Sequence, residues 1–198
     1  DSKIWAGTDG GGINIIDPEN DSIKTLTHVA GDPFSLPAHS IKCIYTDSYG
    51  NIWAGSIRDG LIGVSSSKMA THSDVHIGMH TGLSNPTVLC LYQGTNSEDI
   101  WIGTDGEGLN RFNPKTHTFT HYESTLKTKV VSIASYSQTE LAISVFGDRF
   151  WIFNKLNGKL RPMPVNDPEL NYQVKYAGVG INICNENDGK LMIFGRML

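Results

Sequence analysis

The 198-residue sequence lacks the features that mark membrane, nucleic-acid and disulfide-framework proteins. No hydrophobic run is long enough to cross a bilayer, so this segment itself is expected to make no membrane contact. The net charge is −4 and the charges are scattered without a basic stripe, which excludes a nucleic-acid partner. There are only 3 cysteines, an odd number, and no signal peptide is visible, although a fragment need not keep one.

Helical periodicity is also missing, and a repeated strand motif takes its place. One apolar segment with a Trp-x-Gly centre occurs three times, at Ile4–Thr8, Ile52–Ser56 and Ile100–Thr104, with 48 residues from one tryptophan to the next. Each copy is followed by a glycine-rich turn and a second apolar segment. Self-similarity at this period indicates stacked supersecondary units, and the length fits a four-stranded propeller blade.

The strands of a blade can be assigned from turn residues and β-branched residues. The second repeat has strands at 41–45, 52–56 and 60–65, and a hairpin turn at 47–51 in which Asp47 and Gly50 are the turn residues. The third repeat shows the fourth strand at 118–122. The sequence predicts an all-β fold of four-stranded antiparallel blades, a partial β-propeller, near 1–28, 40–78, 87–122, 129–162 and 173–198.

The Trp-x-Gly motif has a packing explanation. Side chains alternate across a strand, so Trp53 and Gly55 share one face of the blade and Ile52 and Ala54 the other. We expect the tryptophan to fill the gap between blades and the glycine to let the neighbouring backbone come close. The same structural roles fall to Trp5, Gly7, Trp101 and Gly103.

The fourth repeat is disguised. Residues 141–154 align without a gap to 100–113, which puts Ala142 in the tryptophan position and Trp151 in a third strand. Either Trp151 or Phe150 is needed to fill the space that alanine leaves. A fifth unit begins near Gly180 and stops in its second strand, with Met192 in the tryptophan position.

These repeats amount to three or four blades and two partial ones, whereas propellers typically close with about four to eight. The sequence is therefore interpreted as a fragment of a longer protein. An open arc exposes strand edges and an apolar blade face at each end, so we expect self-association of the isolated chain.

Cysteine and histidine give weak signals for a site. Cys43 and Cys90 occupy equivalent strand positions in adjacent blades, predict small buried apolar sites, and are expected to lie too far apart for a disulfide. His72, His76 and His80 have helical spacing around a strand-like segment, so no metal site is expected. Two further histidines, His117 and His121, flank the outer strand and are expected to face solvent.

Phosphate binding and catalysis are not favoured either. The loops 9–12 and 105–108 are rich in glycine, but no helix follows them, so neither forms a phosphate cradle. The segment 46–53 resembles the Asp-box turn of sialidase-type propellers, with an Asp-to-Gly step one residue longer. That turn is itself structural. We expect no catalytic residue, no metal and no cofactor in this chain.

A closer resemblance is to the two-component regulator propeller repeat. The residues that carry it are the loop 31–41 (Gly-Asp-Pro-Phe-Ser-Leu-Pro-Ala-His-Ser-Ile), the turn and motif 50–56 (Gly-Asn-Ile-Trp-Ala-Gly-Ser), and the segment 108–116 (Gly-Leu-Asn-Arg-Phe-Asn-Pro-Lys-Thr). Because loop, turn, motif and third strand occur in order, the resemblance is specific over 1–122 and weaker to 198.

This resemblance implies a non-enzymatic segment of the periplasmic sensor region of a hybrid two-component system, with histidine kinase activity in a part of the protein outside this chain. Such sensors commonly detect oligosaccharides from glycan breakdown. Two alternatives stay open: a propeller lyase or glycosidase acting on polysaccharide, and a propeller used purely for protein–protein interaction.

An oligosaccharide would bind at the face shared by the loops entering the first strands and the loops joining second and third strands. Sugar recognition uses planar hydrogen-bonding groups and aromatic platforms. The candidate ligand-binding residues in these loops are Arg58, Asp59, Asp105, Glu107, Asp148, Arg149, His39, His80 and Phe34.

Overall fold

The computed structural model describes residues 2–32, 34–64, 82–94, 97–125 and 127–164, and the strands Asn182–Asn185 and Leu191–Phe194. In these residues the chain forms five antiparallel sheets. The strands and the single short 3₁₀ helix are, in chain order, β1 (Ile4–Thr8), β2 (Gly12–Asp17), β3 (Ser22–Leu26), β4 (Ile41–Thr46), β5 (Ile52–Ser56), β6 (Leu61–Val64), β7 (Val88–Gln93), β8 (Ile100–Thr104), β9 (Leu109–Asn113), β10 (Thr118–His121), η1 (Glu123–Thr125), β11 (Val130–Ser135), β12 (Glu140–Val145), β13 (Phe150–Asn154), β14 (Leu160–Pro162), β15 (Asn182–Asn185) and β16 (Leu191–Phe194).

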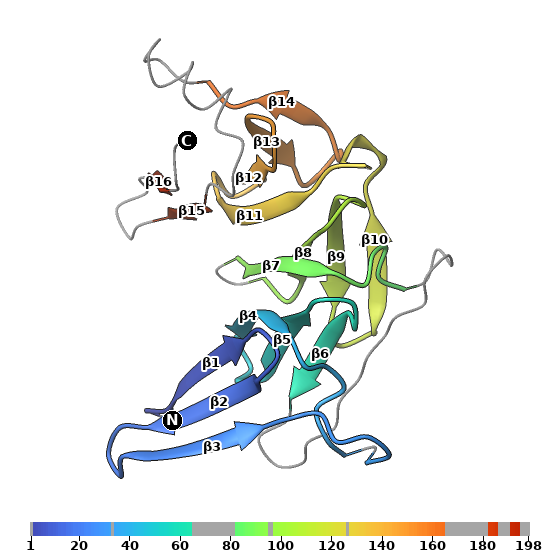
Figure 1. The fold of residues 1–198 in the computed structure, drawn as a ribbon. Coiled ribbons are helices and arrows are strands. Elements are labelled where there is room, and N and C mark those ends of the chain that lie inside the picture. Colours follow the sequence, from blue (N-terminus) through green and yellow to red (C-terminus); the bar gives the residue numbers. More distant parts are fainter. Residues whose placement is uncertain are drawn as a thin grey trace.

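Each sheet is a meander of consecutive strands: β1–β3, β4–β6, β7–β10, β11–β14 and β15–β16. Consecutive sheets stack side by side, with β1 near β4, β4 near β7, β7 near β11 and β11 near β15 (Figure 1). We call β4, β7 and β11 the inner strands, because neighbouring sheets meet along them. The predicted all-β fold of antiparallel propeller blades is confirmed. Among the described residues, no helix has the length and apolar character required to traverse a bilayer.

The two faces of the Trp-x-Gly strands pack as predicted. Ile52 and Ala54 of β5 lie in a buried cluster with Ile13 of the first sheet. Trp53 points the other way and meets the ring of Phe112 edge-on, at 5.2 Å between ring centroids. Trp101 repeats this arrangement against Phe153 of the fourth sheet, at 5.6 Å. Each tryptophan therefore fills the space between its own blade and the next.

The glycine of each motif marks the closest approach of neighbouring blades. A Cβ on Gly7 would lie 2.7 Å from Cγ2 of Ile41, and one on Gly55 would lie 2.5 Å from Cγ1 of Val88. Ile41 and Val88 each begin the inner strand of the next blade. The space that any side chain would occupy is thus already filled by the neighbour, which confirms the predicted reason for glycine.

Strand pairing confirms the alignment of the fourth blade. Leu141 pairs with Phe153 as Ile100 pairs with Phe112, so Ala142 stands in the tryptophan position. The pairing also shows which aromatic residue lies on the same face of the sheet as Ala142. Phe150 pairs with Ser144 and lies on the Ala142 face, whereas Trp151 pairs with Ile143 on the opposite face. Phe150 is 2% exposed and Ala142 0%.

One face of the first sheet is apolar and open. Ile4 pairs with Ile16, which in turn pairs with Ile23, so the three side chains form a row. Ile4 is 55% exposed and Ile23 is 65% exposed. The residues equivalent to Ile4 in the next two blades, Ile52 and Ile100, are buried against the preceding blade. We call the Ile4, Ile16 and Ile23 row the outer face.

We propose that the isolated chain pairs with a second copy through the outer face, since burying this row removes apolar surface from water. Sedimentation velocity is expected to show a concentration-dependent dimer that the double variant Ile4→Lys, Ile23→Lys converts to monomer. Leu156→Lys, at a residue that is 79% exposed in the turn between β13 and β14, serves as control and keeps the dimer. A monomer at all concentrations, or a dimer unaffected by the double variant, contradicts the proposal.

Substitution of the motif glycine tests the close approach of the blades. A Cβ on Gly103 would overlap the carbonyl oxygen of Val130, a backbone atom that cannot rotate away. Gly103→Ala is expected to lower the free energy of unfolding by about 1–3 kcal/mol, the usual range for overpacking. Gly94→Ala is the control, because the nearest atom to its Cβ would be 3.7 Å away. Urea unfolding of both variants measures the difference; equal effects would show that Gly103 is not a packing constraint.

Candidate functional site

Loops at one end of the blades are tied together by a repeated hydrogen bond. The backbone N–H groups of Gly12, Gly60 and Gly108 donate to carbonyl oxygens two residues before the next inner strand, in His39, Pro86 and Thr128, at 2.8, 2.8 and 3.0 Å. All three glycines have φ of 73–75°, the left-handed region that favours glycine. The loops expected to share a face therefore do so.

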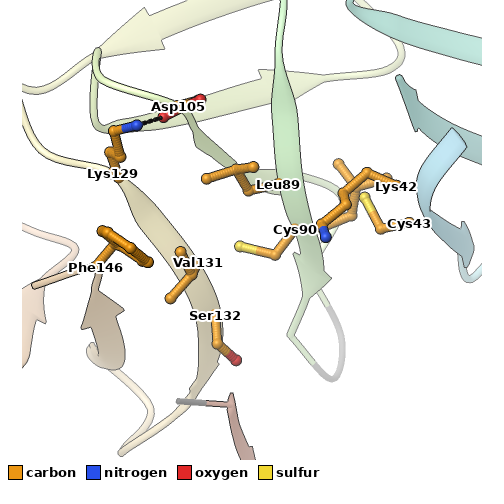
Figure 2. Close-up of a pocket in the computed structure, with 10 residues that line it drawn as sticks. Lys42, Cys43, Leu89, Cys90, Asp105, Lys129, Val131, Ser132 and Phe146 are labelled. Carbon is orange, nitrogen blue, oxygen red and sulfur yellow. Dashed lines mark ion pairs between the residues drawn. The ribbon is translucent and has the colours of Figure 1, made fainter. Parts of the chain in front are cut away.

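A groove of about 670 Å³ runs along the three inner strands from this loop end (Figure 2). It spans the second, third and fourth blades. We call it the inner groove. Its lining residues are Lys42, Cys43, Leu89, Cys90, Leu91, Asp105, Lys129, Val131, Ser132 and Phe146.

A β-bulge at the same point of each inner strand shapes the groove. The pairing register shifts between Ile41 and Cys43 in β4, between Val88 and Cys90 in β7, and between Val130 and Ser132 in β11. A bulge leaves one residue unpaired and redirects its side chain. The unpaired residues are Lys42, Leu89 and Val131, and all three line the groove.

The two described cysteines form inert parts of this wall. Burial raises the pKa of Cys43 to about 12 and raises the pKa of Cys90 well above its usual value. Both thiols are free, as predicted, and each packs beside the motif glycine of its own blade. A thiol that stays protonated is a poor nucleophile and a poor metal ligand. Both cysteines are half-buried, not fully buried as predicted, and neither forms a disulfide.

The loop end of the groove carries a charged pair and an aromatic ring. Lys129 Nζ lies 2.6 Å from Asp105 Oδ1 and 5.9 Å from the centroid of the Phe146 ring. Two backbone hydrogen bonds hold this end: the Asp105 N–H donates to Thr87, and the Phe146 N–H donates to Lys129. Asp105 Oδ1 is inaccessible to solvent, so a ligand would meet Oδ2. The Phe146 ring is 46% exposed and provides a flat apolar surface.

Lys42 occupies the other side of the groove, across Leu89 and Cys90 (Figure 2). It is exposed on β4 and, in the part of the chain that the structure describes, forms no ion pair. The groove thus has a paired lysine at one end, an unpaired lysine at the other, and apolar side chains between them.

Of the described candidates from sequence, Asp105 lines the groove and the others lie elsewhere. Asp148 and Arg149 pair with each other at 3.8 Å, and Asp148 Oδ2 also accepts a hydrogen bond from the Trp151 indole at 3.1 Å. Arg58 is exposed with φ of 86°, and the Asp59 N–H donates to Ser56 Oγ at 2.8 Å.

The remaining candidates form no common site with these. The ring of His39 packs edge-on against His28, at 4.7 Å between centroids. Phe34 is 72% exposed and Glu107 is also exposed. His80 lies outside the described residues, as do His72 and His76. In the residues that are described, no group of three histidine, cysteine or acidic side chains gathers around one point.

Sequence reasoning missed Lys42, Lys129 and Phe146. Asp148 and Arg149 of the loop after β12 are among the candidates from sequence, whereas Phe146 is not. Lys42 lies in the inner strand β4, and Lys129 directly precedes the inner strand β11. No local residue pattern predicts the bulges of these strands.

The expectation for the two histidines of the outer strand was wrong in one case. His117 is exposed, as predicted, and its ring lies near Phe112. His121 is half-buried, and its Nε2 lies 2.7 Å from the carbonyl oxygen of Gly82. Gly82, in the segment entering the third blade, contacts His121 and shields it partly from solvent.

Asp47 is a structural residue and not part of the groove. Its Oδ1 accepts the backbone N–H groups of Tyr49 and Asn51, and its Oδ2 accepts the Asn51 side-chain amide and the Trp53 indole N–H, all within 2.8–2.9 Å. Burial disfavours the charged carboxylate, but these hydrogen bonds outweigh burial and lower the pKa of Asp47. The turn resembling an Asp box therefore anchors the inter-blade tryptophan.

Asp47→Asn is expected to lower the free energy of unfolding by about 1–3 kcal/mol at pH 7, since the indole N–H of Trp53 and the amide of Asn51 lose their acceptor. Because the pKa of Asp47 is lower in the folded protein, its stabilisation is present above the unfolded pKa and is lost as the pH falls through the folded value. The variant and the parent should converge in acid. Urea unfolding at several pH values measures this, with the exposed Asp21→Asn as control; a constant difference at every pH would contradict the role given to the charge.

Comparison with known proteins agrees with the repeat resemblance. Residues 35–58 match the family described as two component regulator propeller. Residues 35–58 are therefore similar to a two-component regulator propeller repeat. The match covers the loop, the inner strand β4, the Asp47 turn and the Trp53 motif of the second blade. No curated protein matches the chain.

Solved structures share the fold. An extracellular domain of a hybrid two-component system from B. thetaiotaomicron superposes with a TM-score of 0.76 at 18% identity, over 96% of this chain and 24% of that one. PorZ, a surface component of the type-IX secretion system of Porphyromonas gingivalis, gives 0.68 at 16% identity, over 96% and 29%. Virginiamycin B lyase from Staphylococcus aureus gives 0.64 at 15% identity, over 97% and 66%. The chain spans about a quarter of the length of the first of these structures.

Proposed function

We propose that this chain is a ligand-sensing segment of the periplasmic sensor domain of a hybrid two-component system, that it has no catalytic role of its own, and that its ligands are oligosaccharides released by glycan breakdown. The observation that carries the proposal is the family match over residues 35–58. It is supported by the shared fold with the extracellular domain of such a system. Kinase activity would lie in a part of the protein outside this chain.

The inner groove is the best candidate for the ligand site. Its volume of about 670 Å³ lies within the range usual for small-ligand sites, roughly 300–1,000 Å³. It is built from three blades, so a ligand lying along it contacts all three at once. A ligand that binds one arrangement of the blades better than another shifts the population toward it, which is the requirement for a sensor.

The groove chemistry suits a sugar. The exposed ring of Phe146 offers a platform for the apolar face of a pyranose. The free oxygen of Asp105 accepts hydrogen bonds from hydroxyl groups, and Lys129 donates them. These groups lie on neighbouring loops held by backbone hydrogen bonds, so they are positioned before a ligand arrives.

The test is thermal unfolding of this chain, and of the extracellular region that contains it, with a panel of plant, host and fungal oligosaccharides. At a ligand concentration of about 100 Kd, stabilisation by about 2.7 kcal/mol is expected to raise Tm by about 5 °C or more for a chain of this size. Phe146→Ala should abolish the shift.

Phe34→Ala is the matched control, because it removes an exposed ring at the loop end but outside the groove. Loss of the shift in Phe34→Ala instead would move the site to the loops. No shift with any oligosaccharide, combined with breakdown of a polysaccharide in the same samples, would replace the sensor by an enzyme. No shift and no breakdown would favour a protein–protein scaffold.

A further inference from the structure

The charges of the inner groove are unbalanced. Its lining contains two lysines, Lys42 and Lys129, and one carboxylate, Asp105. The chain as a whole has the opposite sign, with a net charge of −4. The groove is therefore a cationic site on an acidic protein, and it favours an anionic ligand over a neutral or cationic one.

The two lysines are not equivalent. The charge of Lys129 is already met by Asp105 at 2.6 Å and by the face of Phe146. Lys42 forms no ion pair with any residue in the described ranges, and the β4 bulge holds it on the groove wall. Lys42 is thus the lysine that can form an ion pair with an anionic group of a ligand.

The remaining lining restricts the ligand further. Leu89 and Cys90 lie between Lys42 and the Lys129 and Phe146 side (Figure 2), and Leu91 and Val131 also line the groove, so a ligand that spans it needs apolar surface between its polar groups. A densely charged polyanion would bring negative charge against Asp105, which disfavours it. A hexuronate oligosaccharide meets these demands. Its carboxylates supply an anion for Lys42, its ring faces supply apolar surface, and its hydroxyl groups supply hydrogen-bond donors for Asp105.

We infer that the inner groove binds an acidic oligosaccharide, with a uronate carboxylate on Lys42, a sugar ring on Phe146 and hydroxyl groups on Asp105 Oδ2. The inference rests on the proposed sensing function and narrows its ligand class. Lys42 is then the residue that distinguishes acidic from neutral sugars, because a neutral sugar offers its ammonium no opposite charge.

Calorimetric titration of the chain with galacturonate, mannuronate and glucuronate tetramers tests this, with each tetramer compared with its carboxyl-reduced counterpart. At least one acidic tetramer is expected to bind at least about tenfold more tightly than its reduced form, the usual effect of a charged hydrogen bond. The preference should shrink at high ionic strength. Lys42→Met, which keeps the aliphatic stem, should abolish the preference, and so should Lys42→Gln.

Lys24→Met is the matched control, since Lys24 is exposed on β3 outside the groove, and it should keep the preference. Circular dichroism establishes that each variant is folded. Equal binding of acidic and reduced tetramers overturns the inference and leaves the sensor proposal standing. An acidic preference that survives both Lys42 variants also overturns it. Absence of binding by every tetramer, acidic or reduced, and by the neutral panel overturns both proposals.

Discussion

The close approach of neighbouring blades at the Trp-x-Gly glycine is the constraint on which this structure depends. At Gly55 the first residue of the next inner strand, Val88, fills the space where a side chain would be. The approach sets the distance between blades, and that distance fits one tryptophan, which lies edge-on to an aromatic ring of the next blade. In the second blade, Asp47 holds Trp53 in place by accepting a hydrogen bond from its indole N–H.

The same contact precedes the bulges that shape the inner groove. Because the first residue of each inner strand packs on the preceding glycine, the register shift that follows it falls at the same depth in three blades. The unpaired residues Lys42, Leu89 and Val131 then lie in a row along one wall. The groove is a consequence of blade packing, and its loop end adds Asp105, Lys129 and Phe146 to it.

The sequence predicts the parts of the structure that repeat. The blade period, the two faces of the Trp53 strand, the role of Gly55 and the substitution at Ala142 follow from residue type and spacing. Features that depend on pairing between distant strands do not. Alternation along a single strand could not show that Phe150, and not Trp151, shares the Ala142 face, because strand pairing decides it. From the sequence, Lys42 and His121 are both expected to be ordinary exposed residues. The bulge in β4 places Lys42 on the groove wall, and Gly82 partly covers His121.

In the proposed binding mode, the inner bulges supply side chains that contact the ligand, whereas the Trp-x-Gly contacts hold the blades together. Each contributes one side chain that takes no part in the ladder of its own strand and does not touch the glycine contact between blades. An exchange at Lys42, Leu89 or Val131 therefore alters what the wall presents while the blade beneath it keeps its packing. Under the proposed binding mode, three positions from three blades form a wall whose ligand preference can change one residue at a time.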